Sequence, residues 1–294
     1  MNARFWKGNN DGTVSCSLCF RQCRLGDGQP GICGVRFSTG GTLISPYLGK
    51  FCACAVDPVE KKPLYHWRPG SRIYSLGSLG CNMCCPFCQN HHIADPSDGV
   101  RKKVMSFPVL APEELVREIK ELGLDSVAFT YNEPSLQAEY ICSSAPLLHE
   151  AGIAVVLVTN GAMSEETAEE LISCMGTDGA VNIDIKAFDP EIYRRLGGSL
   201  ETVKANITAF VRSGIHVELT HLVVPGINDS TEAFCNMAEW IASVSPAIPL
   251  HVTRYFPAKH YHEPPTSKEL LYSFASMAEL RLKYVHTGNV QLFQ

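Results

Sequence analysis

Gly80-Cys81-Asn82-Met83-Cys84-Cys85-Pro86-Phe87-Cys88-Gln89-Asn90 is the stretch around which the rest of the chain is organised. Four of the thirteen cysteines fall within it, and three of them, Cys81, Cys85 and Cys88, follow the spacing C-x3-C-x2-C. Thiolates so close together on one loop can converge on iron, and a [4Fe–4S] cluster normally takes four such ligands. Three ligands leave one iron open, as a metal site requires if it is to hold a reacting molecule.

The same loop permits two other ligand sets. Taking Cys84 in place of Cys85 gives the spacing C-x2-C-x3-C. Adjacent residues on a tight loop point in different directions, so these two cysteines cannot be equally good ligands of one cluster. A structural zinc site also stays open, because His91 or His92 would supply the fourth ligand that zinc requires.

The first spacing, with Phe87 directly before its third cysteine, resembles the signature of the radical SAM enzymes. The resemblance implies that Cys81, Cys85 and Cys88 hold a [4Fe–4S] cluster whose open iron is chelated by S-adenosylmethionine. It also implies that Phe87 lies beside the adenine and that Cys84 is an ordinary loop residue. One electron from such a cluster splits the sulfonium and releases a 5′-deoxyadenosyl radical, so the cofactors carry the difficult chemistry.

The bulk composition is that of an ordinary globular protein, with 45% apolar and 19% charged residues among 294. The formal net charge of −5 gives no electrostatic reason to expect a nucleic-acid partner. Residues 1–8 contain no apolar signal segment, and no stretch approaches membrane-spanning length, so we expect no membrane partner and a cytoplasmic location. The cysteine spacings then favour metal ligation in a reducing compartment over disulfides.

Residues 1–70 differ from the rest in being rich in cysteine, glycine and turn residues, which predicts a small cysteine-rich N-terminal domain before a domain at 71–294. Within it, Cys16, Cys19, Cys23 and Cys33 are spaced C-x2-C-x3-C-x9-C, with glycines around them. Four thiolates without a histidine suit structural zinc or a second iron–sulfur cluster, and the spacing does not separate these alternatives.

Two further features receive structural interpretations. Residues 57–66 are charged and broken by two prolines, which is typical of a solvated linker between domains. Cys142, Cys174 and Cys235 fall at apolar positions of expected helices, and we interpret them as small core residues.

From residue 71 onward short β-rich runs alternate with helical patterns. The expected strands are 73–79, 126–131, 153–159, 180–186, 216–224 and 250–254. The expected helices between them include 112–122, 164–175, 200–213 and 230–244, and a final helix (267–282) and extended run (284–286) close the chain. Strands and helices that alternate indicate a parallel sheet, and about six units predict an α/β fold of the partial TIM type, a (β/α)6 barrel.

Polar residues stand where each expected strand ends. In barrels of this type the chemistry lies on the loops after the carboxyl ends of the strands, so these residues form one predicted site. Asp184 and Lys186 end the fourth strand within apolar sequence, which is costly unless they pair or bind something charged, and an internal ion pair is the alternative. Other members are the 131–134 and 159–161 loops, His221, Asn228, His251 and Arg254.

The resemblance narrows once these motifs are included. Nearly the whole chain is similar to the activating-enzyme branch of the radical SAM superfamily, which includes pyruvate formate-lyase activating enzyme, and more closely to the radical SAM members of the AmmeMemoRadiSam system. The motifs that carry it are the N-terminal cysteine motif, Asp57-Pro58-Val59-Glu60-Lys61-Lys62-Pro63, Thr130-Tyr131-Asn132-Glu133-Pro134, Leu222-Val223-Val224-Pro225-Gly226-Ile227-Asn228-Asp229 and Thr287-Gly288-Asn289.

This resemblance implies a set of cofactor-binding residues: Phe87, Asn90, Glu133, Asn160, Asp184, Lys186 and His251. Within the set, Glu133 holds the amino group of methionine, Asn160 lies near the ribose, and the last three surround the methionine carboxylate or an associated cation. An acid for the ammonium and an amine or histidine for the carboxylate is what a zwitterionic amino acid needs. Tyr131-Asn132 and Val158 depart from the family pattern, which has two glycines and an aspartate there.

The sequence therefore predicts a radical SAM oxidoreductase that abstracts a hydrogen atom from an unidentified substrate, which the resemblance suggests is a protein or peptide. Its electron would come from a low-potential donor such as a flavodoxin or ferredoxin. The alternative is an iron–sulfur or zinc-binding scaffold or electron carrier in a complex with Memo-type and Ammecr-type proteins. A carrier alone has no need of Glu133, Asp184, Lys186 and His251, so these residues separate the two hypotheses.

Overall fold

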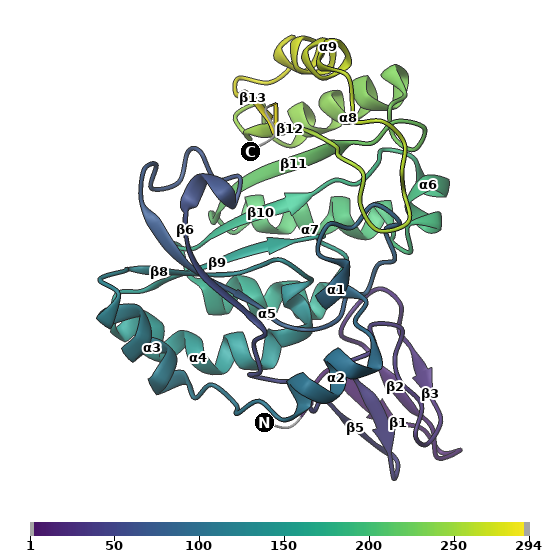
Figure 1. Ribbon diagram of the computed structural model, residues 1–294, viewed down its shortest axis with the longest axis vertical. Helices are drawn as coiled ribbons and strands as arrows, with labels where there is room; N and C mark the ends of the chain where they lie inside the picture. Colours follow the sequence, from purple (N-terminus) through teal and green to yellow (C-terminus); the bar gives the residue numbers. More distant parts are fainter. Residues whose placement is uncertain (1–2, 291–294) are drawn as a thin grey trace.

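The computed structural model describes residues 3–290, and one eight-stranded sheet with helices along it forms most of the molecule (Figure 1). Strands β7 to β13 run parallel to their neighbours in chain order, and β6 pairs antiparallel with β7 at one edge. This confirms the predicted partial barrel. The strands are β6 (Ala53–Pro58), β7 (Arg72–Gly77), β8 (Ser126–Phe129), β9 (Ala154–Thr159), β10 (Ala180–Asp184), β11 (His216–Val223), β12 (Leu250–Arg254) and β13 (Val285–Gly288).

Helices follow the strands, and five of them match the expected ranges: α3 (Pro112–Glu121), α5 (Glu165–Met175), α7 (Leu200–Arg212), α8 (Thr231–Val244) and α9 (Lys268–Glu279). Serine side chains cap the last four by accepting a backbone N–H of the first turn. Helix α4 (Ala138–Glu150) is the helix expected around Cys142, for which no range was predicted, and it continues through Pro146. The remaining helical segments are η1 (Val59–Lys61), α1 (His91–Ala94), α2 (Asp98–Met105), η2 (Pro134–Gln137) and α6 (Pro190–Arg195).

The cysteine-rich N-terminal region folds into two small sheets beside α2 (Figure 1). Their strands are β1 (Trp6–Gly8), β2 (Val14–Cys16), β3 (Arg24–Leu25), β4 (Phe37–Thr39) and β5 (Thr42–Ile44). A buried ion pair fastens this region to the barrel, because Arg36 Nη1 lies 2.7 Å from Glu139 Oε1 on α4. Strand β6 precedes residue 70 in the chain but belongs to the large sheet. The division into two domains at residue 70 stays a prediction.

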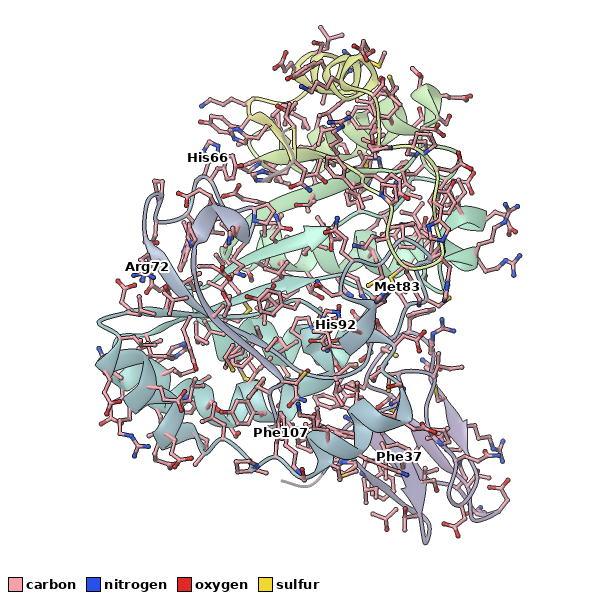
Figure 2. The ribbon with its side chains drawn as sticks, in the orientation of Figure 1. Phe37, His66, Arg72, Met83, His92 and Phe107 are labelled. Atoms are coloured by element: carbon pink, nitrogen blue, oxygen red, sulfur yellow. A yellow bond between two sulfur atoms is a disulfide. The ribbon has the colours of Figure 1, made fainter. Side chains whose placement is uncertain are left out.

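The interpretation of residues 57–66 as a solvated linker is wrong. Asp57 lies on β6, and its carboxylate accepts a hydrogen bond of 2.9 Å from Lys62, whose side chain is only 2% exposed. Farther on, the backbone N–H groups of Tyr65 and His66 donate to the buried carboxylate of Glu218 on β11. His66, at the edge of the molecule in Figure 2, bonds His286 of β13. The charges that suggest a linker instead bind one another and the barrel.

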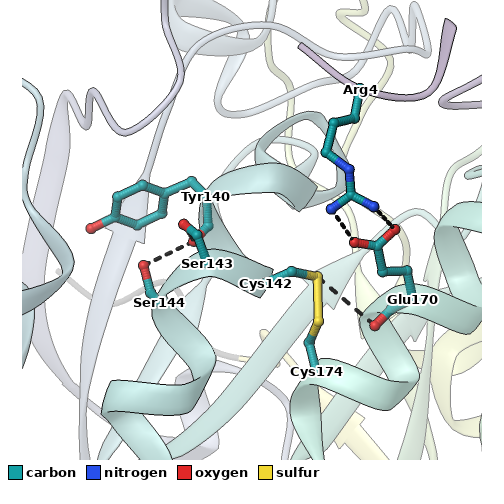
Figure 3. The surroundings of a disulfide bond; sticks show 7 residues. All are labelled: Arg4, Tyr140, Cys142, Ser143, Ser144, Glu170 and Cys174. Carbon is teal, nitrogen blue, oxygen red and sulfur yellow. Dashed lines mark hydrogen bonds and ion pairs between the residues drawn. A yellow bond between two sulfur atoms is a disulfide. The ribbon is translucent and has the colours of Figure 1, made fainter. Parts of the chain in front are cut away.

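The interpretation of Cys142 and Cys174 as small core residues is also wrong. They form a disulfide between α4 and α5, and both are partly exposed (Figure 3). The ion pair between Arg4 and Glu170 lies beside it and brings the start of the chain onto α5. Cys235 fits its predicted packing role, with its sulfur 3.9 Å from that of Met277.

Candidate active site

A cavity of about 300 Å³ opens at the carboxyl ends of the parallel strands, which is within the usual size range of small-molecule sites. Its lining brings together most of the residues predicted to bind cofactors. Those that line it are Cys81, Cys85, Phe87, Cys88, Asn90, Glu133, Asn160, Asp184 and Lys186. They come from the loop after β7, the loops after β8 and β9, and the end of β10.

The cluster loop, residues 80–90, turns Cys84 away from this cavity. Cys84 is exposed and is absent from the lining, whereas Cys81, Cys85 and Cys88 are all part of it. Two contacts hold Cys84 outward: its N–H donates to the carbonyl of Leu196 at 2.9 Å, and its sulfur lies 3.8 Å from the carbonyl of Arg195. The geometry therefore favours the spacing C-x3-C-x2-C over its alternative.

The sulfur of Cys81 faces two nitrogen donors. The backbone N–H of Met83 lies 3.4 Å from this sulfur, and the Asn160 amide nitrogen lies 3.6 Å from it. Burial raises the pKa of Cys81 and raises that of Cys85 to about 11, so these groups are poor thiolates until a metal binds them. Hydrogen bonds to a ligating sulfur tune a bound cluster, so the chemistry of these donors fits an iron–sulfur cluster.

Within residues 3–290, no set of three or more His, Cys, Asp or Glu side chains already surrounds the position of a single metal ion. This holds for the cluster loop and for the N-terminal cysteines alike.

Glu133 is the fully enclosed carboxylate of the cavity, with only 1% of the residue exposed. Its Oε1 accepts hydrogen bonds from Thr159 Oγ1 (2.7 Å) and Ser135 N (3.0 Å), and its Oε2 accepts one from Asn160 N (2.9 Å). Burial raises the pKa of Glu133, although these hydrogen bonds act in the opposite direction. A carboxylate held this rigidly in an enclosed cavity is suited to bind an ammonium group, which would offset its lost hydration.

Asp184 and Lys186 form the predicted ion pair, with Nζ and Oδ2 2.8 Å apart. Both also line the cavity, so pairing and a role in binding do not exclude each other here. Burial acts to lower the pKa of Lys186, but the Asp184 carboxylate and the Cys85 sulfur raise it above its ordinary value. Lys186 is therefore a cation across the physiological range and can face a second carboxylate.

Two asparagines fasten the loops around the cavity to each other. Asn90 donates from Nδ2 to the carbonyl of Tyr131 at 2.7 Å, and Asn160 donates from Nδ2 to Asn82 Oδ1 at 2.8 Å. Phe87 is 3% exposed and packs within the same lining.

Of the predicted cofactor-binding residues, His251 is the one that does not line the cavity. It is buried one layer deeper, with Nε2 2.6 Å from Glu218 Oε2 and its ring against that of Tyr65. The reason is position along the strand: His251 is near the start of β12, and Thr253, two residues later on the same face, lines the cavity instead. His221 is likewise internal, and Asn228 ties the loop after β11 to the carbonyl of Lys186.

Sequence reasoning placed the 131–134 loop at the site but missed Lys62 and the contacts that join Lys62 and Tyr131 to Asp57. Tyr131 and Lys62 line the cavity, and both bind the Asp57 carboxylate, Tyr131 through its Oη at 2.8 Å and Lys62 at 2.9 Å. Burial and the Asp57 carboxylate raise the pKa of Tyr131 to about 12. The two lysines of residues 57–66 were the available signal, but the left-handed backbone of Tyr131 (φ 70°), which directs this side chain, leaves no trace in its residue type.

Residues 76–238 match the Radical SAM superfamily, and this chain belongs to it. An uncharacterized protein of Methanocaldococcus jannaschii is 33% identical over 98% of this chain and 85% of its own length. A second protein of that archaeon, provisionally named a glycyl-radical enzyme activating enzyme, is 28% identical over 52% of this chain and 62% of its own. In fold alone, the chain resembles Streptococcus suis SuiB bound to S-adenosylmethionine (TM-score 0.52, 16% identity, 70% of this chain and 48% of SuiB).

Membership makes the chain an enzyme of the class that uses a [4Fe–4S] cluster and S-adenosylmethionine. Across residues 3–290, every helix is too short or too polar to cross a bilayer.

Proposed function

We propose that the protein reductively cleaves S-adenosylmethionine and uses the resulting 5′-deoxyadenosyl radical to take a hydrogen atom from a substrate. The observation that carries this proposal is the lining of one cavity by three cysteines, a buried carboxylate and a lysine–aspartate pair. A scaffold or electron carrier needs the cysteines but not the other groups, so the lining favours the enzyme.

The residues take separate roles in this proposal. Cys81, Cys85 and Cys88 would hold the cluster, and the N–H of Met83 is directed at the sulfur of Cys81. Glu133 would bind the methionine ammonium, and Lys186, oriented by its partner aspartate, would face the methionine carboxylate. When bound, the cluster and cofactor supply one-electron cleavage of the sulfonium. The chain itself binds the charged groups, orients them and encloses the cavity.

The substrate we propose is a protein or peptide, with a glycyl Cα–H as one such hydrogen. Support comes from the relative named as a glycyl-radical enzyme activating enzyme and from the activating-enzyme motifs of the sequence. On the same motifs we propose that the protein belongs to the AmmeMemoRadiSam system, acts in the cytoplasm and works with Memo-type and Ammecr-type proteins. A flavodoxin or ferredoxin would supply the electron.

We further infer that the N-terminal cysteines bind a metal, as zinc or as a second iron–sulfur cluster. Support comes from their surroundings: Cys16 and Cys19 are buried, and a Cβ placed on Gly31 would lie 3.7 Å from the Cys33 sulfur and 4.0 Å from that of Cys23. The strands around them have only two or three residues each, so a metal would add a cross-link between segments that share few backbone hydrogen bonds.

The decisive experiment is anaerobic reconstitution followed by incubation with S-adenosylmethionine and dithionite. We expect a cluster bound by the loop cysteines and slow formation of 5′-deoxyadenosine and methionine without substrate, detected by liquid chromatography and mass spectrometry. Cys88→Ala should lose both cluster and product. Glu133→Gln should keep the cluster but weaken cofactor binding about tenfold or more, because a charge-assisted hydrogen bond is lost. A cluster that is reduced but never yields 5′-deoxyadenosine would instead support the electron carrier.

A further inference from the structure

A hollow of about 780 Å³ lies on the N-terminal region, on the outer side of the cluster loop. We call it the basic hollow. It is lined by Arg21 and Arg24 together with the apolar residues Phe20, Pro30 and Ile32, and Ile32 is 63% exposed. Among the described residues of its lining there is no carboxylate. An exposed apolar side chain between cations is typical of a protein-binding surface.

Arg21 connects the basic hollow to the cluster loop. Its Nε donates to the carbonyl of Asn82 at 2.7 Å, and its Nη2 donates to the carbonyl of Gly197 at 2.8 Å. The packing there is so close that a Cβ on Gly197 would lie 2.9 Å from the sulfur of Cys84. A single layer of side chains and one glycine turn therefore separates this part of the surface from the back of the loop.

The basic hollow is distinct from the cavity. The two have no lining residue in common, and the cluster loop lies between them, with Cys81, Cys85 and Cys88 toward the cavity and Cys84 toward the other side. A molecule in the basic hollow therefore approaches the cluster from behind and leaves the cavity free for substrate and cofactor. This is the arrangement that an electron donor needs, whereas a substrate has to reach the cavity.

The charge near the basic hollow is positive although the chain carries a net charge of −5. Arg24 is 64% exposed and has Asp11 as its partner. At the end of α6, beside the glycine turn, Arg194 and Arg195 share the single carboxylate of Glu191 and are 73% and 71% exposed. Excess cations on one face attract an acidic partner and raise its rate of association.

We propose that the basic hollow and the end of α6 form the docking surface for an acidic protein that donates one electron at a time. The proposal rests on the proposed function, which requires a reduced cluster. In the step itself the donor loses one electron and the cluster gains it, and no bond forms or breaks. Arg21, which lines the basic hollow, contacts the cluster loop directly at the carbonyl of Asn82.

The test is stopped-flow reduction of the reconstituted enzyme by flavodoxin hydroquinone, followed through bleaching of the cluster absorbance. Arg24→Glu and, separately, Ile32→Glu should slow the second-order rate about tenfold at low salt, and 0.3 M salt should remove most of the difference for Arg24→Glu. Arg117→Glu on α3 is the matched control, because Arg117 is 61% exposed and also has carboxylate partners, and it should leave the rate unchanged.

Reduction by dithionite distinguishes a failure of the docking surface from a failure of the proposed function. Dithionite is small and needs no docking surface, so both variants should be reduced by it, and should then cleave S-adenosylmethionine, at the wild-type rate. If dithionite reduction yields no 5′-deoxyadenosine in any form of the enzyme, the proposed function fails. If wild type and both variants accept electrons from flavodoxin equally fast while dithionite works normally, the docking surface is wrong. Iron content and melting temperature confirm that the variants fold.

Discussion

At the scale of single residues, Cys84 and Cys85 show how two chemically identical neighbours acquire different environments. Cys85 faces the cavity beside Lys186, whose charge acts on its thiol, whereas Cys84 is exposed and bonded to the turn after α6. The contacts that determine this difference come from residues 195–197, more than a hundred positions away in the chain. In the local sequence, only the resemblance of the first spacing and Phe87 to the radical SAM signature distinguishes the two thiols.

Replacing these cysteines one at a time tests the assignment. We expect Cys84→Ala to keep the cluster, its electron paramagnetic resonance signal and the cleavage of S-adenosylmethionine, because its thiol points away from the cavity. Cys85→Ala should lose all three. Iron analysis and the spectrum of the dithionite-reduced protein measure the outcome, with Cys54→Ala, another exposed cysteine, as the control. The opposite pattern would move the open iron and invalidate the proposed cofactor position.

Site residues could be predicted from the sequence when their chemistry is local. Cluster cysteines have to be close along the chain, and an aspartate and a lysine two apart at the end of an extended run fall on one face, so both predictions needed only spacing. Predicting the positions of His251 and Tyr131 required knowledge of the tertiary structure. Whether His251 reaches the cavity depends on how deep it lies along β12, and the position of Tyr131 depends on a left-handed backbone and on β6.

At the scale of elements, β11 carries a buried histidine that makes the stability of the barrel depend on pH. His221 is 2% exposed, and its Nδ1 donates to the carbonyl of Ile185 at 2.8 Å. Its Nε2 is buried without a partner among the described residues. Burial lowers the pKa of His221 to about 4 from an ordinary value of 6.5, so the folded protein holds this ring neutral.

The sign of the effect follows from that difference. The unfolded chain binds a proton near pH 6.5 and the folded chain only near pH 4, so the stability from neutral His221 is complete above pH 6.5 and is lost as the pH falls toward 4. The loss amounts to about 3 kcal/mol. Urea unfolding of the cluster-free protein between pH 4.5 and 7.5 measures it.

His221→Asn keeps a donor for the Ile185 carbonyl and should flatten this part of the pH dependence, whereas His92→Asn, at an exposed position, should not. Wild-type and His221→Asn curves that stay parallel across the range would show that His221 makes no such contribution.

The regular elements were the part of the fold most readily predicted. Strands β7 to β12 and five helices match their expected ranges because periodicity and caps act within a few residues. The failed predictions share one cause, because each of these features depends on a partner that is distant in sequence. Strand β6 exists because it pairs with β7, residues 57–66 are ordered because they bind Glu218, and Cys142 bonds Cys174 because α4 packs on α5.

At the scale of the whole molecule, the N-terminal region covers the cluster loop. A Cβ on Gly80 would lie 2.6 Å from the carbonyl oxygen of Cys33, so the region packs directly against the residue before Cys81. Together with the Arg36–Glu139 ion pair on α4, this makes the region part of the enzyme's structure. Its own stability therefore matters to the site.

We expect the N-terminal cysteines to supply that stability through a metal. Cys16→Ala or Cys33→Ala in the full chain should remove this metal and lower the melting temperature by about 5 °C. The cluster of the barrel loop should remain. Elemental analysis distinguishes zinc from additional iron, and Cys235→Ala, at a packing position on α8, is the control. Wild-type protein with no metal beyond one barrel cluster would contradict the prediction.

Residues 57–66 leave β6 at one edge of the sheet and reach β11 and β13 at the other, where Glu218 and His286 bind them. The segment thus acts as a strap across the open side of the barrel, near the amino ends of the parallel strands. An incomplete barrel is otherwise free to widen at its seam, but this one would first have to break the hydrogen bonds of Tyr65 and His66 to Glu218. A large substrate would therefore be accommodated by movement of the loops around the cavity mouth, while the amino-terminal ends of the barrel strands keep their spacing.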